Sequence, residues 1–179
     1  MENKILKSGA IDELDCSILR ILQADGHTPN IEIARRIRMA PSATLERIRK
    51  LERRGIIRGY PARLDPSALG LDLLAFVFVR SSGRVGGIKT GRRLAAIPGV
   101  QEVHHIAGED CFLVKVRTAN PEALGELLRT RFGAIPEVTS TRTTIVLETI
   151  EETSHLPVPD SASAGKSPAR PRKKGSSRA

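Results

Sequence analysis

The chain has 179 residues, 40% of them apolar, which is enough for one or two small domains with a real hydrophobic core. Its formal charge of +9 and sequence pI of about 10.2 favour a polyanionic partner, either nucleic acid or an anionic membrane surface. Two cysteines are too few for a disulfide framework or a zinc cluster, and no segment approaches the roughly 20 apolar residues of a membrane span. We therefore expect a cytoplasmic protein without a resident metal or cofactor.

Two helices are predicted before residue 40. Apolar residues keep a helical period from Asp12 to Asp25, with Asp12 as the N-cap and Asp15 in the first turn, where a negative charge suits the helix dipole. A short second helix is predicted from Asn30, acting as its N-cap, to about Arg38.

A third, strongly basic helix is predicted over residues 41–55. Ser42 is its candidate N-cap, and Gly55 is expected to end it in a left-handed conformation. Leu45, Ile48 and Leu51 form its apolar arc, and most of its cations lie on the other side. The short separation from the second helix is that of a helix-turn-helix. In a basic protein, this arrangement favours DNA binding over an ordinary solvated face.

The candidate DNA contacts divide into two groups. The first turns of the basic helix are expected to approach base edges, and the later cations to hold phosphates. If Arg47 grips a guanine, Arg47→Ala should cost about 1 to 3 kcal/mol at the cognate site. The full set is Ser42, Ala43, Thr44, Glu46, Arg47, Arg49, Lys50, Arg53 and Arg58.

A domain boundary is predicted after the basic helix. Residues 56–64 are interrupted by Gly and Pro and are expected to form a short ribbon or wing, from which Arg58 and Arg63 would touch phosphate. The turn-rich residues 65–70 read as a linker. The prediction is a DNA-binding domain over residues 1–64 and a second domain over residues 71–152.

The second domain is predicted to be α+β. Its first strand, from about residue 71 to 79, is apolar on both faces, which suggests burial between helices on one side and a second sheet on the other. Another subunit is one possible source of that second sheet. A helix (85–97), two strands (100–107 and 111–118), a helix that Asn120 caps and a strand (138–149) follow. This βαββαβ order is ferredoxin-like.

The remaining residues, 153–179, have almost no large apolar side chains and are predicted to be disordered. From residue 157 onward there are six Lys/Arg and one Asp, a net charge of +5. Residues 166–174 are candidates for binding along phosphates or in a minor groove. A solubilising tail without a specific role is an equally good interpretation.

The order and spacing of several motifs resemble the Lrp/AsnC, or feast/famine, transcription regulators over residues 11–151. The motifs are IDELDCSIL at 11–19, EIA at 32–34, RIRKLERRGIIRGY at 47–60, PGV at 98–100, GEDCFL at 108–113 and STRTTIVLE at 140–148. The resemblance implies an N-terminal winged helix-turn-helix, joined to a C-terminal effector-binding domain called RAM. It also implies that the sheets of RAM domains pair into homodimers, and often into octamers. The expected partner is double-stranded DNA, and the expected location is the cytoplasm, in association with the nucleoid.

The hairpin turn at residues 108–110 is the candidate effector site. Its backbone N–H groups suit a carboxylate and its acidic side chains an ammonium group, although a plain solvated hairpin explains the same residues. The resemblance favours an amino-acid effector, with Ile106, Gly108, Glu109 and Asp110 as candidate contacts. Many family members carry an aromatic and then an acidic residue after Gly-[Glu/Asp], whereas Asp110 here precedes Cys111. The acid is therefore expected on the other face of the hairpin.

Two other functions remain open from the sequence. His104 and His105 are an adjacent titratable pair, and siroheme decarboxylases are similar in order of elements, but this chain has no Trp and a single Tyr. An architectural DNA-compacting protein without an effector is favoured by the basic tail. No catalytic residue, phosphate loop or metal motif is predicted.

Overall fold

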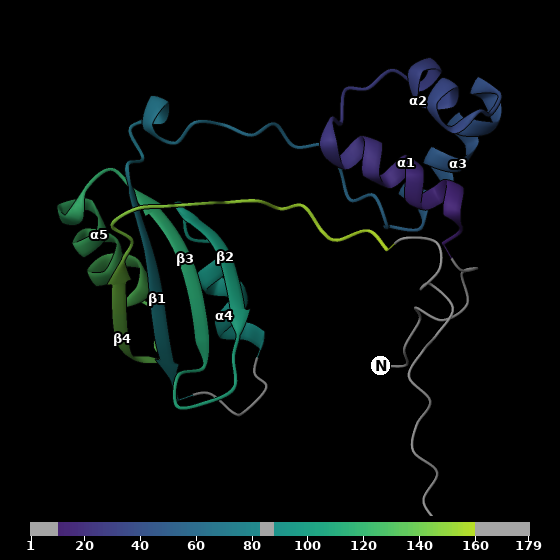
Figure 1. Ribbon diagram of the computed structural model, residues 1–179. Coiled ribbons are helices and arrows are strands. Elements are labelled where there is room, and N and C mark those ends of the chain that lie inside the picture. Colours follow the sequence, from purple (N-terminus) through teal and green to yellow (C-terminus); the bar gives the residue numbers. More distant parts are fainter. Residues whose placement is uncertain (1–10, 83–87, 160–179) are drawn as a thin grey trace, which may run out of the picture. The chain divides into compact units, whose positions relative to one another are not determined.

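The computed structural model describes residues 11–82 and 88–159. The chain forms two compact units, one of Met1–Ala62 with the segment that starts at Thr153, and the other of Arg63–Glu152 (Figure 1). Residues 166–174, the predicted phosphate-binding part of the tail, lie outside the described residues. Within the described ranges, no helix is long and apolar enough to cross a membrane.

The first unit is built from α1 (Glu13–Ala24), α2 (Asn30–Ile37) and α3 (Pro41–Arg53). At the start of α1, the Asp12 carboxylate accepts a hydrogen bond from the Asp15 backbone N–H at 2.7 Å, and the Asp15 carboxylate accepts one from Asp12, which completes a capping box. The predicted cap is thus confirmed. Each helix contributes to one small core, formed by Ile18, Ile33, Ile48 and Leu51.

The predicted caps of α2 and α3 are wrong. Asn30 is the first residue of α2 rather than its cap, and its side-chain amide instead donates to the Pro41 carbonyl at 2.9 Å. Helix α3 starts at Pro41, one residue before the predicted cap Ser42, and neither helix has a side-chain cap. Proline suits the first helical position because its missing N–H would have no intrahelical partner there.

Two residues in left-handed conformations end the last two helices of this unit. Arg38 adopts φ 55° after α2, where its N–H closes the final turn. Gly55 adopts φ 68° after α3, as predicted. The predicted ribbon over residues 56–64 is not formed as strands. Ile56 and Ile57 instead pack against the helical core, which uses the apolar residues that a wing strand would need.

The second unit contains a short 3₁₀ turn, η1 (Ser67–Leu69), inside the predicted linker, followed by β1 (Leu73–Ser81), α4 (Ile88–Ala95), β2 (Val100–His105), β3 (Phe112–Thr118), α5 (Pro121–Leu127), the π-helical turn η2 (Leu128–Phe132) and β4 (Val138–Ile145). The strands form one antiparallel sheet in the order β2-β3-β1-β4. The predicted ferredoxin-like βαββαβ fold is therefore confirmed.

Element ends in this unit differ from the predictions where tertiary partners decide them. Strand β4 ends at Ile145 rather than Thr149, because the paired strand β1 begins at Leu73 and the Val146 N–H makes the last bond to it. Strand β2 ends at His105. The Asn120 cap of α5 is confirmed, since its side chain accepts from the Ala123 N–H at 2.8 Å.

The two faces of the sheet are unequal. On one face, Ala75, Val77 and Val79 of β1 are fully buried in a core that includes Leu94 of α4 and Leu124 of α5. The opposite face carries the alternate side chains of the same strands, including Phe76 and Phe78 of β1 and Leu113, Lys115 and Arg117 of β3. We call this second surface the open face.

Candidate nucleic-acid interface and effector turn

The exposed side of α3 carries most of the predicted DNA contacts. Helix packing selects Thr44, Ile48 and Leu51, at positions i, i+4 and i+7, as the inward stripe, while Leu45 is 37% exposed. The Thr44 side chain is fully buried, because its hydroxyl is satisfied by the Ala40 carbonyl at 3.1 Å. Its predicted approach to base edges is therefore not available in this structure. The residues left exposed are Ser42, Ala43, Glu46, Arg49, Lys50, Arg53 and Arg58.

Arg47 is occupied by an ion pair within the first unit. Its Nη1 lies 2.6 Å from Asp12 Oδ2 and 2.8 Å from Asp15 Oδ1, so one guanidinium joins α3 to the capping box of α1. Asp15 is buried, which makes this pair less exposed to solvent screening than a surface salt bridge. The sequence did not reveal this contact, because the partners lie 32 and 35 residues apart.

The electrostatics of the capping box agree with that geometry. Burial alone would raise the pKa of Asp12, but the Asp15 backbone N–H and the Arg47 guanidinium outweigh it and leave this pKa below its ordinary value of 3.8. The same pair raises the pKa of Arg47, chiefly through its hydrogen bond with Asp12. The charged form of each partner therefore favours the folded unit.

Two further contacts position or modify the predicted interface. The hydrogen bond from the Asn30 side-chain amide to the Pro41 carbonyl joins the first turn of α2 to the first turn of α3. On the exposed side of α3, Glu46 pairs with Arg53 at 2.7 Å, and this hydrogen bond lowers the pKa of Glu46. Among the predicted phosphate contacts, Arg53 thus starts from an intrahelical pair.

The predicted effector turn closes the end of β2 and β3. The Ile106 N–H donates to the Cys111 carbonyl at 3.0 Å, and Gly108 adopts φ 131°. Both acids of the turn have cationic partners: Arg80 of β1 donates to Glu109 and Arg142 of β4 donates to Asp110, each at 3.1 Å. The turn therefore presents two charge pairs rather than two free carboxylates.

Arg142 links the turn to the open face. Its guanidinium lies 4.0 Å from the centre of the Phe78 ring, which is a cation–π contact, while it also binds Asp110. The Asp110 side chain thus points toward β4. The candidate effector residues thus lie beside two arginines, Arg80 and Arg142, that come from strands distant in the sequence.

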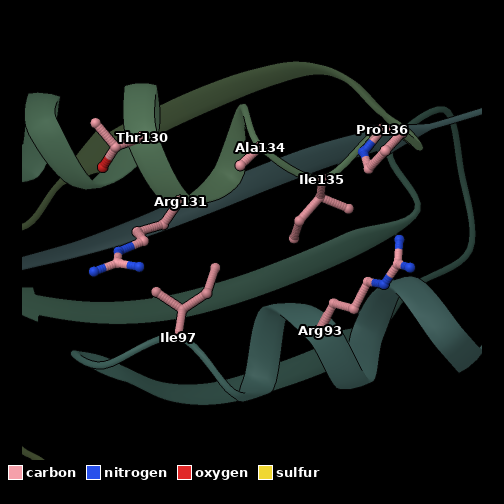
Figure 2. Close-up of a pocket in the computed structure, with 7 residues that line it drawn as sticks. All are labelled: Arg93, Ile97, Thr130, Arg131, Ala134, Ile135 and Pro136. Atoms are coloured by element: carbon pink, nitrogen blue, oxygen red, sulfur yellow. The ribbon is translucent and has the colours of Figure 1, made fainter.

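A separate surface hollow of about 320 Å³ lies between α4 on one side and η2 with the loop before β4 on the other (Figure 2). Its lining comprises Arg93, Ile97, Thr130, Arg131, Ala134, Ile135 and Pro136, none of which belongs to the effector turn. Arg93 is already paired with Glu137 at 2.8 Å. The hollow and the turn are therefore distinct features of the second unit.

The two adjacent histidines contact different neighbours. His104 lies 3.0 Å from Glu102 on an exposed part of β2, and the His105 ring packs 5.3 Å from that of Phe112. Cys16 is buried and Cys111 partly buried, and both are free thiols, which pack as small apolar side chains. Within residues 11–82 and 88–159, no group of three or more His, Cys, Asp or Glu side chains is placed to hold a metal ion.

Family models match both units of the chain. A winged helix-turn-helix DNA-binding model matches residues 11–58, and the Lrp/AsnC ligand binding domain model matches residues 74–156. These matches cover the three helices and the βαββαβ unit described above.

Curated relatives extend over most of the chain. The HTH-type transcriptional regulator FL11 of Pyrococcus horikoshii is 41% identical over 149 residues, which is 83% of this chain and 97% of that protein. The leucine-responsive regulatory protein of Escherichia coli K12 is 33% identical over 148 residues, or 82% of this chain and 90% of that one.

Solved structures share the fold. A feast or famine regulatory protein from M. tuberculosis, complexed with L-methionine, is 35% identical, has a TM-score of 0.77, and is covered in full by 84% of this chain. A Neisseria meningitidis transcriptional regulator in complex with L-Met is 28% identical with a TM-score of 0.75, over 82% of this chain and 96% of that one. These relatives are regulators, which decides against the decarboxylase alternative. The chain belongs to the Lrp/AsnC family of DNA-binding transcriptional regulators.

Proposed function

We propose that the exposed side of α3 is the surface that binds double-stranded DNA, with Ser42, Ala43 and Glu46 near base edges and Arg49 and Lys50 on phosphates. This proposal is supported by the exposure of these side chains, whereas Thr44 is buried and Arg47 is held in an ion pair within the unit. Arg47 then acts as a positioning residue that fixes α3 against α1. Arg58, exposed just beyond α3, is a further phosphate contact in this proposal.

Lys50→Ala is expected to weaken binding to cognate and random duplexes by a similar factor. A cation that holds only phosphate contributes no sequence information, and its loss should reduce the salt dependence of log Kd by about one. Fluorescence anisotropy across a salt series measures both quantities. Ser17→Ala, on α1, is the control. A loss confined to one DNA sequence would instead make Lys50 a base-reading residue.

We further propose that a zwitterionic amino acid binds at the turn formed by Ile106, Gly108, Glu109 and Asp110. An α-amino acid carries a carboxylate and an ammonium group, which complement the Arg80–Glu109 and Arg142–Asp110 pairs together with the turn N–H groups. The two relatives solved with L-methionine support an effector of this chemical class.

A thermal-shift screen of the twenty amino acids tests the effector proposal. A ligand that binds only the folded protein must raise its stability, by about 2.7 kcal/mol when its concentration is a hundred times Kd. L-Methionine is the first compound to examine. Arg142→Gln should abolish the shift, because it removes one charge of the proposed site. If none of the twenty raises the unfolding temperature, the amino-acid effector is rejected.

The open face supports a homodimer in which two such faces pack together. It displays Phe76 and Phe78 half-buried in the single chain, with Leu113 beside them. Large apolar side chains on a sheet face suit packing against a second sheet. Two α3 helices related by a two-fold axis would favour pseudo-palindromic DNA, and such dimers are the units from which octamers would assemble. We also propose that the target is chromosomal DNA, which would put the protein at the nucleoid in the cytoplasm.

A further inference from the structure

Residues 153–159, which follow the second unit, are held against α1 by hydrogen bonds. The Gln23 side-chain amide makes two hydrogen bonds with the backbone of Leu156: Nε2 donates to the carbonyl at 2.7 Å, and Oε1 accepts from the N–H at 2.9 Å. One turn earlier on α1, the Arg20 guanidinium donates to the Pro159 carbonyl at 2.6 Å. We call these three hydrogen bonds the α1 clasp. It binds backbone atoms, so it needs an extended peptide with free N–H and carbonyl groups rather than a particular side chain.

The sequence of the segment prepares it for this contact. Leu156 and Val158 each precede a proline, which restricts both to extended backbone before any contact forms. A segment that is already extended loses less conformational entropy when it docks. Within residues 151–159, every residue except Val158 is exposed, so the hydrogen bonds of the clasp account for the position of the segment better than apolar burial does.

The charge of the next residues suggests what the clasp is for. Residues 160–179 carry six Lys/Arg and one Asp. Helix α1, to which the clasp holds Pro159, belongs to the same unit as α3 with its exposed Arg49 and Lys50. Because the clasp holds Pro159 on α1, the basic stretch starts from the first unit rather than from the second unit, which ends at Glu152.

We propose that Gln23 and Arg20 form a docking site for residues 153–159, and that docking presents the basic residues 160–179 to the phosphates of the duplex bound by α3. This inference rests on the proposed DNA-binding role of α3. A tethered cationic segment gains effective concentration when its tether starts at the binding site, and each phosphate it neutralises adds about 0.9 to the salt dependence of log Kd. The bound ligand is the sugar-phosphate backbone, so the contribution is independent of DNA sequence.

Four full-length variants test the proposal by fluorescence anisotropy with a selected duplex and a random duplex over a salt series. Leu156→Pro removes the N–H that Gln23 accepts, whereas Leu156→Ala keeps it and is the matched control. The third variant replaces the six Lys/Arg of residues 160–179 with Gln, and the fourth combines this change with Leu156→Pro. Circular dichroism verifies that each is folded.

Neutralising the tail is expected to weaken binding to both duplexes about tenfold or more and to lower the salt slope by about two to five. Leu156→Pro should weaken DNA binding several-fold, whereas Leu156→Ala should leave the affinity unchanged. The combined variant should bind as weakly as the neutral-tail variant, because the clasp acts only through the cations. The proposal is overturned if Leu156→Pro binds DNA as tightly as the unmodified protein, or if the neutral-tail variant does so. Either result would leave DNA binding by α3 intact. Failure of the unmodified protein to bind either duplex would overturn the proposed interface itself.

Discussion

Phe76→Glu is expected to convert the proposed dimer into a monomer at micromolar concentration. Phe76 lies near the middle of the open face, opposite Lys115 on β3 and Thr144 on β4. Burying a phenylalanine contributes about 1.5 to 3 kcal/mol, and the lower value applies to a ring that is already half-buried in one chain. A two-fold dimer loses this contribution twice, so its dissociation constant should rise about 100-fold.

The variant should fold, because position 76 is only half-buried in the single chain and its side chain lies outside the core on the other face of the sheet. Sedimentation equilibrium measures the association constant. Ala134→Glu, which adds a carboxylate at an exposed loop residue before β4, is the control and should remain dimeric. DNA affinity should also fall when the dimer is lost, since a monomer cannot bind two half-sites together. An unchanged dimer in Phe76→Glu would show that the open face is not the interface.

Arg47→Ala is expected to destabilise the first unit and to weaken binding to cognate and random DNA equally. Removing the guanidinium leaves the buried Asp15 carboxylate without its cation, a loss of about 1 to 3 kcal/mol in the free energy of unfolding. Because α3 then loses its connection to the capping box of α1, the positioning of every DNA contact suffers together. Urea denaturation and anisotropy measure the two effects.

Arg49→Ala is the matched control for Arg47→Ala. It removes an exposed arginine from the same helix, so it should leave stability unchanged and lower affinity through phosphate alone. A double-mutant cycle between Arg47→Ala and Asp15→Asn should show a coupling energy well above zero. Normal stability in Arg47→Ala, with a loss on cognate DNA only, would restore the base-reading role that the sequence suggested.

Local signals in the sequence located most elements because those signals act within a few residues. The Asp12 and Asp15 box, the Asn120-Pro121 start of α5 and the left-handed Gly55 all appear in the structure. Ser42 failed as a cap because Pro41 allowed the helix to begin one residue earlier. The four-residue excess in β4 has a different origin, since the end of a strand depends on its neighbour.

The candidate sites were less predictable because long-range contacts decide what each side chain is free to do. The helical period of α3 did not distinguish Thr44 from Leu45, since a threonine can enter the core when a carbonyl satisfies its hydroxyl. Arg47 looked like a surface cation until its partners on α1 were known. Likewise, Glu109 and Asp110 were identified from the sequence, but their arginine partners come from β1 and β4.

Selection of bound genomic fragments, with and without a mixture of amino acids, tests the central claim most directly. A regulator that reads DNA through paired α3 helices and senses an amino acid should enrich fragments that share one pseudo-palindromic pattern. Adding amino acids should change the occupancy or spacing of those fragments, and Arg142→Gln should abolish that response. Recovery of fragments without a common sequence, and unchanged by every amino acid, would contradict the account and favour an architectural DNA-binding protein.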